Sequence, residues 1–118
     1  MLIVDDSSAF RTAARALLLD DGFSVELAVD GEDALRRIAH RRPDLVLLDV
    51  ALPGRDGIEV AASISQLEAP PVVVLVSSRA AASYGDRIST AHARGFIPKS
   101  ELSGAALTAL LERSDRAL

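Results

Sequence analysis

The sequence predicts an α/β domain built on a doubly wound, five-stranded parallel sheet. Two observations lead to this prediction: five short apolar runs, and between them segments in which apolar residues recur every three or four positions. Most of the runs are apolar throughout, which is typical of parallel strands covered by helices on both faces. Since parallel neighbours are joined by right-handed helical crossovers, the succession of β-α units predicts an open sheet with helices on both sides.

The strands are expected at residues 2–4, 23–29, 45–48, 72–76 and 95–97. The second run alone approaches the alternation of polar and apolar side chains that marks a strand with one less buried face. We therefore expect it at an edge of the sheet. Pro43, Pro70 and Pro71 stand just before strands, where a preceding helix could not continue.

A helix is expected after each strand. Three segments carry apolar residues at helical spacing, namely Phe10, Ala13, Ala14 and Leu17, then Ala34, Leu35 and Ile38, and last Leu107, Leu110 and Leu111. Asp30 can cap the second of these helices, and Ser103 can cap the last. Residues 84–93 give the weakest helical pattern, because Gly85 and the β-branched Thr90 lower helix propensity.

Composition limits the class of protein. A chain of 118 residues with 49% hydrophobic residues suits one globular domain. A net charge of -4 and a pI near 5.1 argue against direct binding of nucleic acid, because a phosphate backbone requires a clustered basic surface. No apolar run approaches the roughly 20 residues of a membrane span, and cysteine is absent. We expect a cytoplasmic protein without a membrane segment or a disulfide framework.

Polar residues follow the strands at the points where a functional site is expected. In open parallel sheets, the site lies beyond the carboxyl ends of the strands. The residues found there are Asp5 and Asp6 after the first strand, Asp49 at the end of the third, Ser77 and Ser78 after the fourth, and Lys99 after the fifth. Three carboxylates brought together repel one another, so a cation must balance them.

The donor set suits phosphoryl transfer. All the ligands are oxygens, which favours a hard ion such as Mg²⁺ that keeps waters and leaves room for a phosphate. Asp49 is the candidate nucleophile, Lys99 a second positive centre, and Ser77 a hydroxyl that can hold a phosphoryl oxygen.

Each of these residues, taken alone, has an ordinary explanation. Acidic residues after a strand often cap a helix, and an aspartate such as Asp49 is common in turns. Ser77 alone would be a solvated loop serine and Lys99 a surface lysine. The prediction rests on their occurrence together at four strand ends.

Four segments resemble the successive signatures of the response-regulator receiver domain of two-component signalling. They read LIVDDSSAFR, LVLLDVALPGRDG, VVVLVSS and GFIPKSEL, and the similarity runs from Leu2 through the last helix. The resemblance implies one receiver domain over residues 1–118, with the flavodoxin-like strand order 2-1-3-4-5.

The resemblance also assigns roles to the strand-end residues. It implies that Asp5 and Asp6 help to bind Mg²⁺ and that Asp49 is phosphorylated. Ser77 and Lys99 are the serine and the lysine that accompany this aspartate in the family.

Two further residues receive roles, and one loop departs from the family pattern. The backbone carbonyl of Ala51 is implied as a metal ligand, and Phe96 as the aromatic residue that changes position with the serine. Many receivers have a proline after the lysine, whereas here Ser100 follows Lys99 and Pro98 precedes it. The path of this loop is therefore not fixed by the resemblance.

Other residues near the motifs have both functional and ordinary interpretations. Arg55 and Arg79 occupy positions where they can alter kinase docking or the lifetime of the phosphoryl group, or else be solvated surface charges. His40 and His92 lie on helical segments away from the strand ends, so neither is expected to relay phosphate.

The implied function is a phospho-acceptor switch. A sensor histidine kinase or a small acyl phosphate would donate the phosphoryl group, so the domain would catalyse only its own modification and hydrolysis. GFIPKSEL most resembles receivers of regulators with a helix-turn-helix output domain, which implies control of transcription by that domain or by a partner. A stand-alone receiver and the receiver of a longer regulator remain alternatives. A homodimer through the last strand and its helices is a further candidate partner.

Two other functions compete with this one. An aspartyl-phosphate phosphatase usually has a second acid two residues after the nucleophile, where this chain has Ala51. A pseudo-receiver would bind proteins without being phosphorylated, and the complete set of acidic, serine and lysine residues counts against it.

Overall fold

The computed structural model describes residues 1–116 and contains the predicted sheet. The five strands are β1 (Leu2–Val4), β2 (Glu26–Ala28), β3 (Leu45–Asp49), β4 (Val72–Ser77) and β5 (Gly95–Pro98). All neighbouring strands are parallel, and their order is β2-β1-β3-β4-β5. The predicted fold class, the strand order and the edge position of β2 are confirmed.

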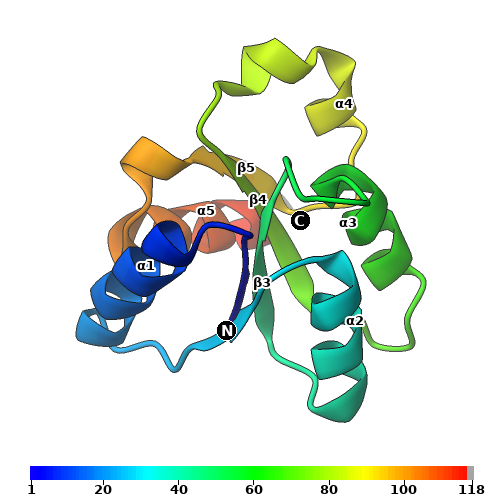
Figure 1. Cartoon of the computed structure of the whole chain (residues 1–118). Coiled ribbons are helices and arrows are strands. Elements are labelled where there is room, and N and C mark those ends of the chain that lie inside the picture. Colours follow the sequence, from blue (N-terminus) through cyan, green and yellow to red (C-terminus); the bar gives the residue numbers. More distant parts are fainter. Residues whose placement is uncertain (117–118) are drawn as a thin grey trace.

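Helices cover both faces of the sheet (Figure 1). They are α1 (Ser8–Asp20), α2 (Gly31–His40), α3 (Gly57–Ser65), α4 (Asp86–Ser89) and α5 (Gly104–Arg116), with 3₁₀ turns η1 (Ala81–Tyr84) and η2 (Lys99–Glu101). Figure 1 shows α1 and α5 on one side of the sheet and α2 and α3 on the other. None of these helices, within residues 1–116, has the length and apolar character needed to cross a bilayer.

The core forms two layers because successive strand side chains point to opposite faces. Ile3, Leu47 and Val74 pack with buried residues of α1 and α5, such as Leu18 and Leu107. The alternate strand residues, including Val4, Leu48 and Leu75, pack with α2 and α3 through Ile38, Val60 and Ile64. Both faces of the central strands are therefore buried, which explains why the strands read as continuous apolar runs.

The second strand is shorter than the predicted 23–29. β1 is the neighbour of β2, and the pairing runs only from Leu2 with Glu26 to Val4 with Ala28. An edge strand can extend only as far as its partner, so the three residues of β1 limit β2. Phe23 and Val25 instead pack as partly buried side chains against the layer of α1 and α5.

The helix expected over residues 84–93 is only partly present: α4 covers Asp86–Ser89, η1 lies before it and ends at Tyr84, and His92 lies in a bend rather than on a helix. Gly85 separates η1 from α4 with a φ of 58°, a left-handed conformation that interrupts a helix. Both predicted caps are confirmed. The Asp30 side chain accepts a hydrogen bond from the N–H of Asp33 at 2.8 Å, and the Ser103 hydroxyl accepts one from the N–H of Ala106 at 2.9 Å.

Asp33 fixes the start of α2 against the end of β2. It is only 7% exposed, and its carboxylate accepts hydrogen bonds from the N–H of Val29 and from the guanidinium groups of Arg36 and Arg37. Burial alone would raise the pKa of Asp33, but the hydrogen bonds from Val29 and from the two guanidinium groups outweigh burial and lower that pKa below 3.8.

Asp33→Ala should lower the free energy of unfolding by about 1–3 kcal/mol, because the N–H of Val29 loses its acceptor. Asp20→Ala, on an exposed residue of α1, is the control and should change it by less than about 0.5 kcal/mol. The folded pKa of Asp33 lies below the unfolded value, so its contribution is complete above that value and is lost as pH falls through the folded pKa. Urea unfolding of Asp33→Ala that matches the wild type near neutral pH would contradict this role.

Candidate functional site

The carboxyl ends of four strands bring the predicted residues to one edge of the sheet. Asp5 directly follows β1, Asp49 ends β3, Ser77 ends β4, and Lys99 follows β5. Asp5, Asp49 and Ser77 are buried, with exposed fractions of 0%, 4% and 1%, whereas Asp6 is exposed. Buried carboxylates are rare unless they are paired or coordinate a cation, so this edge is chemically distinct from an ordinary surface.

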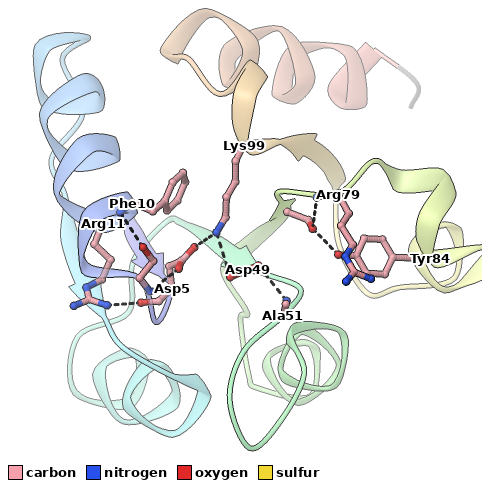
Figure 2. Close-up of polar contacts among 10 residues, drawn as sticks. Asp5, Phe10, Arg11, Asp49, Ala51, Arg79, Tyr84 and Lys99 are labelled. Carbon is pink, nitrogen blue, oxygen red and sulfur yellow. Dashed lines mark hydrogen bonds and ion pairs between the residues drawn. The ribbon is translucent and has the colours of Figure 1, made fainter.

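Lys99 lies between the two buried carboxylates. Its ammonium nitrogen is 2.6 Å from Oδ2 of Asp5 and 3.3 Å from Oδ2 of Asp49 (Figure 2). The same nitrogen lies 4.4 Å from the centre of the Phe10 ring, a cation–π contact from the side of α1. Burial alone would lower the pKa of Lys99, but the contacts with both aspartates outweigh it and raise that pKa, so the ammonium stays charged.

The turn between β1 and α1 holds Asp5 in place. Oδ1 of Asp5 accepts a hydrogen bond from the N–H of Ser7 at 2.8 Å, and the backbone carbonyl of Asp5 accepts one from Arg11 at 2.6 Å. Ser7 is the N-cap of α1, with its hydroxyl accepting from the N–H of Phe10. The cap of this helix is therefore Ser7 rather than either aspartate, and Asp6 has no capping role.

Asp49 is held at the start of the loop that joins β3 to α3. Its Oδ1 accepts a hydrogen bond from the N–H of Ala51 at 3.1 Å. Burial raises the pKa of Asp49 to about 6, and the charge of Asp5 adds to this, while the Ala51 hydrogen bond and Lys99 oppose it. The carboxylate is thus ionised at neutral pH but costly to keep charged without a further cation.

Gly57 allows this loop to pass close to Asp49. Its N–H donates to the carbonyl of Val50 at 2.8 Å, and a Cβ on Gly57 would stand 2.0 Å from the backbone oxygen of Asp49. No side chain fits at this distance, so glycine is required by the close approach rather than by its backbone angles.

The acidic residues could hold a metal ion. Carboxylate oxygens of Asp5, Asp6 and Asp49 all lie within 4.8 Å of one another. Oδ2 of Asp5 is buried and makes no hydrogen bond of regular geometry, although it forms the ion pair with Lys99. Three carboxylates against one ammonium leave two negative charges, which a divalent cation with oxygen ligands would balance.

Ser77 makes its contacts with the segment that follows β4. Its Oγ accepts a hydrogen bond from the N–H of Arg79 at 3.0 Å and lies 2.5 Å from the hydroxyl of Tyr84. The Tyr84 ring in turn packs against Phe96, with 6.3 Å between ring centres. Phe96 is partly buried on the face of the sheet that α2 and α3 cover.

The two arginines near the motifs differ from each other. Arg55 donates hydrogen bonds to Glu32 at 3.2 Å and to the hydroxyl of Ser63 at 2.6 Å, so it fastens the loop before α3 to two helices. Arg79 is exposed. Lys99 and Ser100 lie in the turn η2, which gives the loop after β5 its path without a proline at position 100.

Sequence reasoning missed three residues of the site. The sequence placed Phe10 only on a helix face, Tyr84 only in a weak helical pattern, and Gly57 only at the end of the LVLLDVALPGRDG segment, without a role of its own. A glycine at the first position of a helix, as Gly57 is in α3, carries no distinct signal, and the Phe10 contact depends on how α1 packs. Tyr84 had one signal that could have found it, because it is the only tyrosine in the sequence.

Comparison with known proteins agrees with this geometry. The family model of the response regulator receiver domain matches residues 1–112. The chain belongs to the response regulator receiver domain family. Over 102 residues, this receiver is 41% identical to the response regulator MprA of Mycobacterium sp. (strain KMS), a match that covers 84% of this chain and 43% of that protein.

Two other relatives bear on the function. The receiver is 40% identical over 77 residues to the transcriptional regulatory protein AfsQ1 of Streptomyces coelicolor, covering 65% of this chain and 34% of that protein. The structure of the response regulator protein TrrA of Thermotoga maritima, in complex with Mg²⁺ and BeF, has a TM-score of 0.82 at 27% identity and covers 96% of each chain. The receiver thus spans about a third to a half of the length of the curated relatives.

Gly57→Ala should destabilise the receiver by about 1–3 kcal/mol, since the added methyl group meets the backbone of Asp49. It should also move the NMR signals of Asp49 and Ala51. Gly54→Ala is the matched control, because Gly54 has a φ of 79° and open space around it. The added methyl group should lower the free energy of unfolding by about 1 kcal/mol through backbone strain at position 54, without moving the signals of Asp49. If Gly57→Ala and Gly54→Ala lower the free energy of unfolding equally, and the NMR signals of Asp49 do not move, the approach of Gly57 to Asp49 is not tight.

Proposed function

We propose that this chain is a single receiver domain over residues 1–118, of which the last two lie outside the described part, and that it accepts a phosphoryl group on Asp49 with Mg²⁺ bound. The observation that best supports this function is the ammonium of Lys99, which lies between the buried carboxylates of Asp5 and Asp49 in a cluster of three carboxylates. That arrangement supplies one fixed positive charge and a place for a second.

In the proposed phosphoryl transfer, Asp49, Lys99 and Ser77 have different roles. An oxygen of the Asp49 carboxylate attacks phosphorus, a new O–P bond forms, and the bond from phosphorus to the donor breaks. The donor is a phosphohistidine of a sensor kinase, whose imidazole leaves and takes up a proton, or acetyl phosphate, from which acetate leaves. Lys99 faces the phosphoryl oxygens, and Ser77 donates its hydroxyl to one of them.

Mg²⁺, when bound, neutralises charge on the phosphoryl oxygens and on the acidic cluster. Asp5, Asp6, Asp49 and the carbonyl of Ala51 are the residues that would hold it. The three carboxylates come within reach of a single ion, and Ala51 is adjacent through the hydrogen bond of its N–H to Asp49.

The proposed output is a change of the surface around β5. Ser77, with Phe96 as the aromatic residue of the switch, would link phosphorylation to the face formed by β5 and its neighbouring helices. That face would contact an output domain, a partner or a second copy of the receiver. AfsQ1 is by name a transcriptional regulatory protein, which supports control of transcription. A sensor kinase as donor implies a cytoplasmic location.

Incubation with acetyl phosphate and Mg²⁺ should add one phosphoryl group to Asp49, detected by intact mass and peptide mapping. Asp49→Ala should abolish the addition, because it removes the nucleophile. Asp44→Ala changes an exposed aspartate just before β3 and is the matched control that should label normally. Labelling that survives Asp49→Ala or removal of Mg²⁺ would sink the assignment, and no labelling at all would leave a phosphorylation-independent binding module.

Asp6→Ala should weaken Mg²⁺ binding and phosphorylation while keeping or raising the thermal stability of the metal-free protein. The reason is that Asp6 is exposed and adds repulsion to the acidic cluster without capping α1. Calorimetric Mg²⁺ titration and thermal unfolding measure the two effects separately. If Asp6→Ala unfolds the domain and leaves Mg²⁺ affinity intact, Asp6 is structural.

A further inference from the structure

Tyr84 ties the segment after β4 to the end of that strand. We define the β4–α4 segment as residues 78–89, which includes η1 and α4. At its middle, the Tyr84 hydroxyl lies 2.5 Å from Oγ of Ser77, and the Tyr84 ring packs against Phe96. One side chain therefore contacts both residues that the proposed switch requires.

A second contact holds the far end of the same segment. Arg87 donates to Oδ2 of Asp56 at 2.5 Å, and Asp56 is the N-cap of α3. This ion pair is solvent-accessible, with a side-chain exposure of 53% for Arg87, so it is worth little on its own. The bond of Ser77, which is buried, is the stronger of the two polar attachments described here.

The Ser77 hydroxyl is already engaged. It offers one proton and two lone pairs, and the N–H of Arg79 uses one lone pair. Both of its present partners belong to the chain that follows β4, whereas Asp49 ends the neighbouring strand β3. Figure 2 shows Arg79 and Tyr84 apart from the group formed by Asp5, Lys99 and Asp49. A turn of the Ser77 side chain toward a phosphoryl group therefore takes its oxygen away from Tyr84.

We propose that Tyr84 is a positioning residue that holds the Ser77 hydroxyl away from the acceptor site, and that a phosphoryl group on Asp49 takes this hydroxyl from Tyr84 and releases the β4–α4 segment. This inference rests on the proposed function. Either hydroxyl can donate in the Ser77–Tyr84 contact, so the release follows from the turn of the Ser77 side chain: its oxygen leaves Tyr84 in order to donate a charge-assisted hydrogen bond to a phosphoryl oxygen.

If Tyr84 has this role, Ser77 acts on Phe96 through Tyr84 and not directly. Phe96 has no hydroxyl, and its ring meets Ser77 only through Tyr84 among the contacts described above. Loss of the Ser77 bond would free the Tyr84 ring, and movement of that ring would uncover Phe96. Phosphorylation would thus reach Phe96 through the β4–α4 segment.

Tyr84→Phe tests this, because it removes the hydroxyl and keeps the ring against Phe96. The probe is beryllofluoride with Mg²⁺, which stands in for the phosphoryl group on Asp49. Without a bond to break, Tyr84→Phe should bind beryllofluoride about 2- to 12-fold more tightly than the wild type. A purely structural residue would not give tighter binding when it is truncated.

Amide hydrogen exchange supplies the second readout. In the wild type, exchange within residues 78–89 should become faster when beryllofluoride and Mg²⁺ are added. In Tyr84→Phe and in Ser77→Ala it should already be fast without them. Ser83→Ala changes an exposed serine of the same segment and should behave as the wild type.

The outcomes separate this inference from the function on which it rests. If acetyl phosphate does not label Asp49 in the wild type, the proposed function fails. If Asp49 is labelled but Tyr84→Phe binds beryllofluoride no more tightly than the wild type, the positioning role of Tyr84 is overturned. Exchange in residues 78–89 that slows or stays constant on addition of beryllofluoride would overturn the release.

Discussion

The structure depends on one buried electrostatic arrangement, the ammonium of Lys99 between the carboxylates of Asp5 and Asp49. Two carboxylates at strand ends with almost no exposure would be strongly destabilising without a cation. Lys99 reaches both from β5, and Phe10 on α1 covers its ammonium group. The balance is incomplete, since the three carboxylates of Asp5, Asp6 and Asp49 gather around one ammonium group. An incomplete balance is what a site needs if a divalent ion and a charged phosphoryl group are to bind there.

The fold explains why this arrangement is available. The carboxyl ends of the parallel strands β1, β3 and β5 bring Asp5, Asp49 and Lys99 to one edge, and the apolar layers on both faces exclude water from behind them. The helices contribute to the site through their N-terminal residues. Ser7 caps α1 beside Asp5, and Gly57 lets α3 begin against the backbone of Asp49. The same tight packing links the acceptor site to the β4–α4 segment, because Ser77 is both a strand end and the attachment point of Tyr84.

Apolar runs and strand-end polar residues are local features, so the sequence predicted the sheet and the residues at the strand ends, whereas the strand order was implied by the resemblance to receiver domains. It overestimated β2, whose length is set by its neighbour β1 rather than by its own residues. It predicted one weak helix over residues 84–93, whereas Gly85 at a φ of 58° interrupts the chain there and only Asp86–Ser89 is α-helical. The contacts of Tyr84, Phe10 and Gly57 were missed because each joins a residue to another element of the fold, which the periodicity of its own segment does not record.

Titration of Mg²⁺ into the receiver, followed by NMR of backbone amides, tests most directly whether the strand-end carboxylates form a cation site. We expect saturable binding at one site, with shifts confined to residues near Asp5, Asp6, Asp49 and Lys99. Asp5→Asn should abolish these shifts, while Asp44→Ala, on an exposed aspartate, should preserve them. Binding that does not saturate, or that leaves the strand ends unchanged, would contradict the claim that the partly balanced carboxylates form a divalent-cation site.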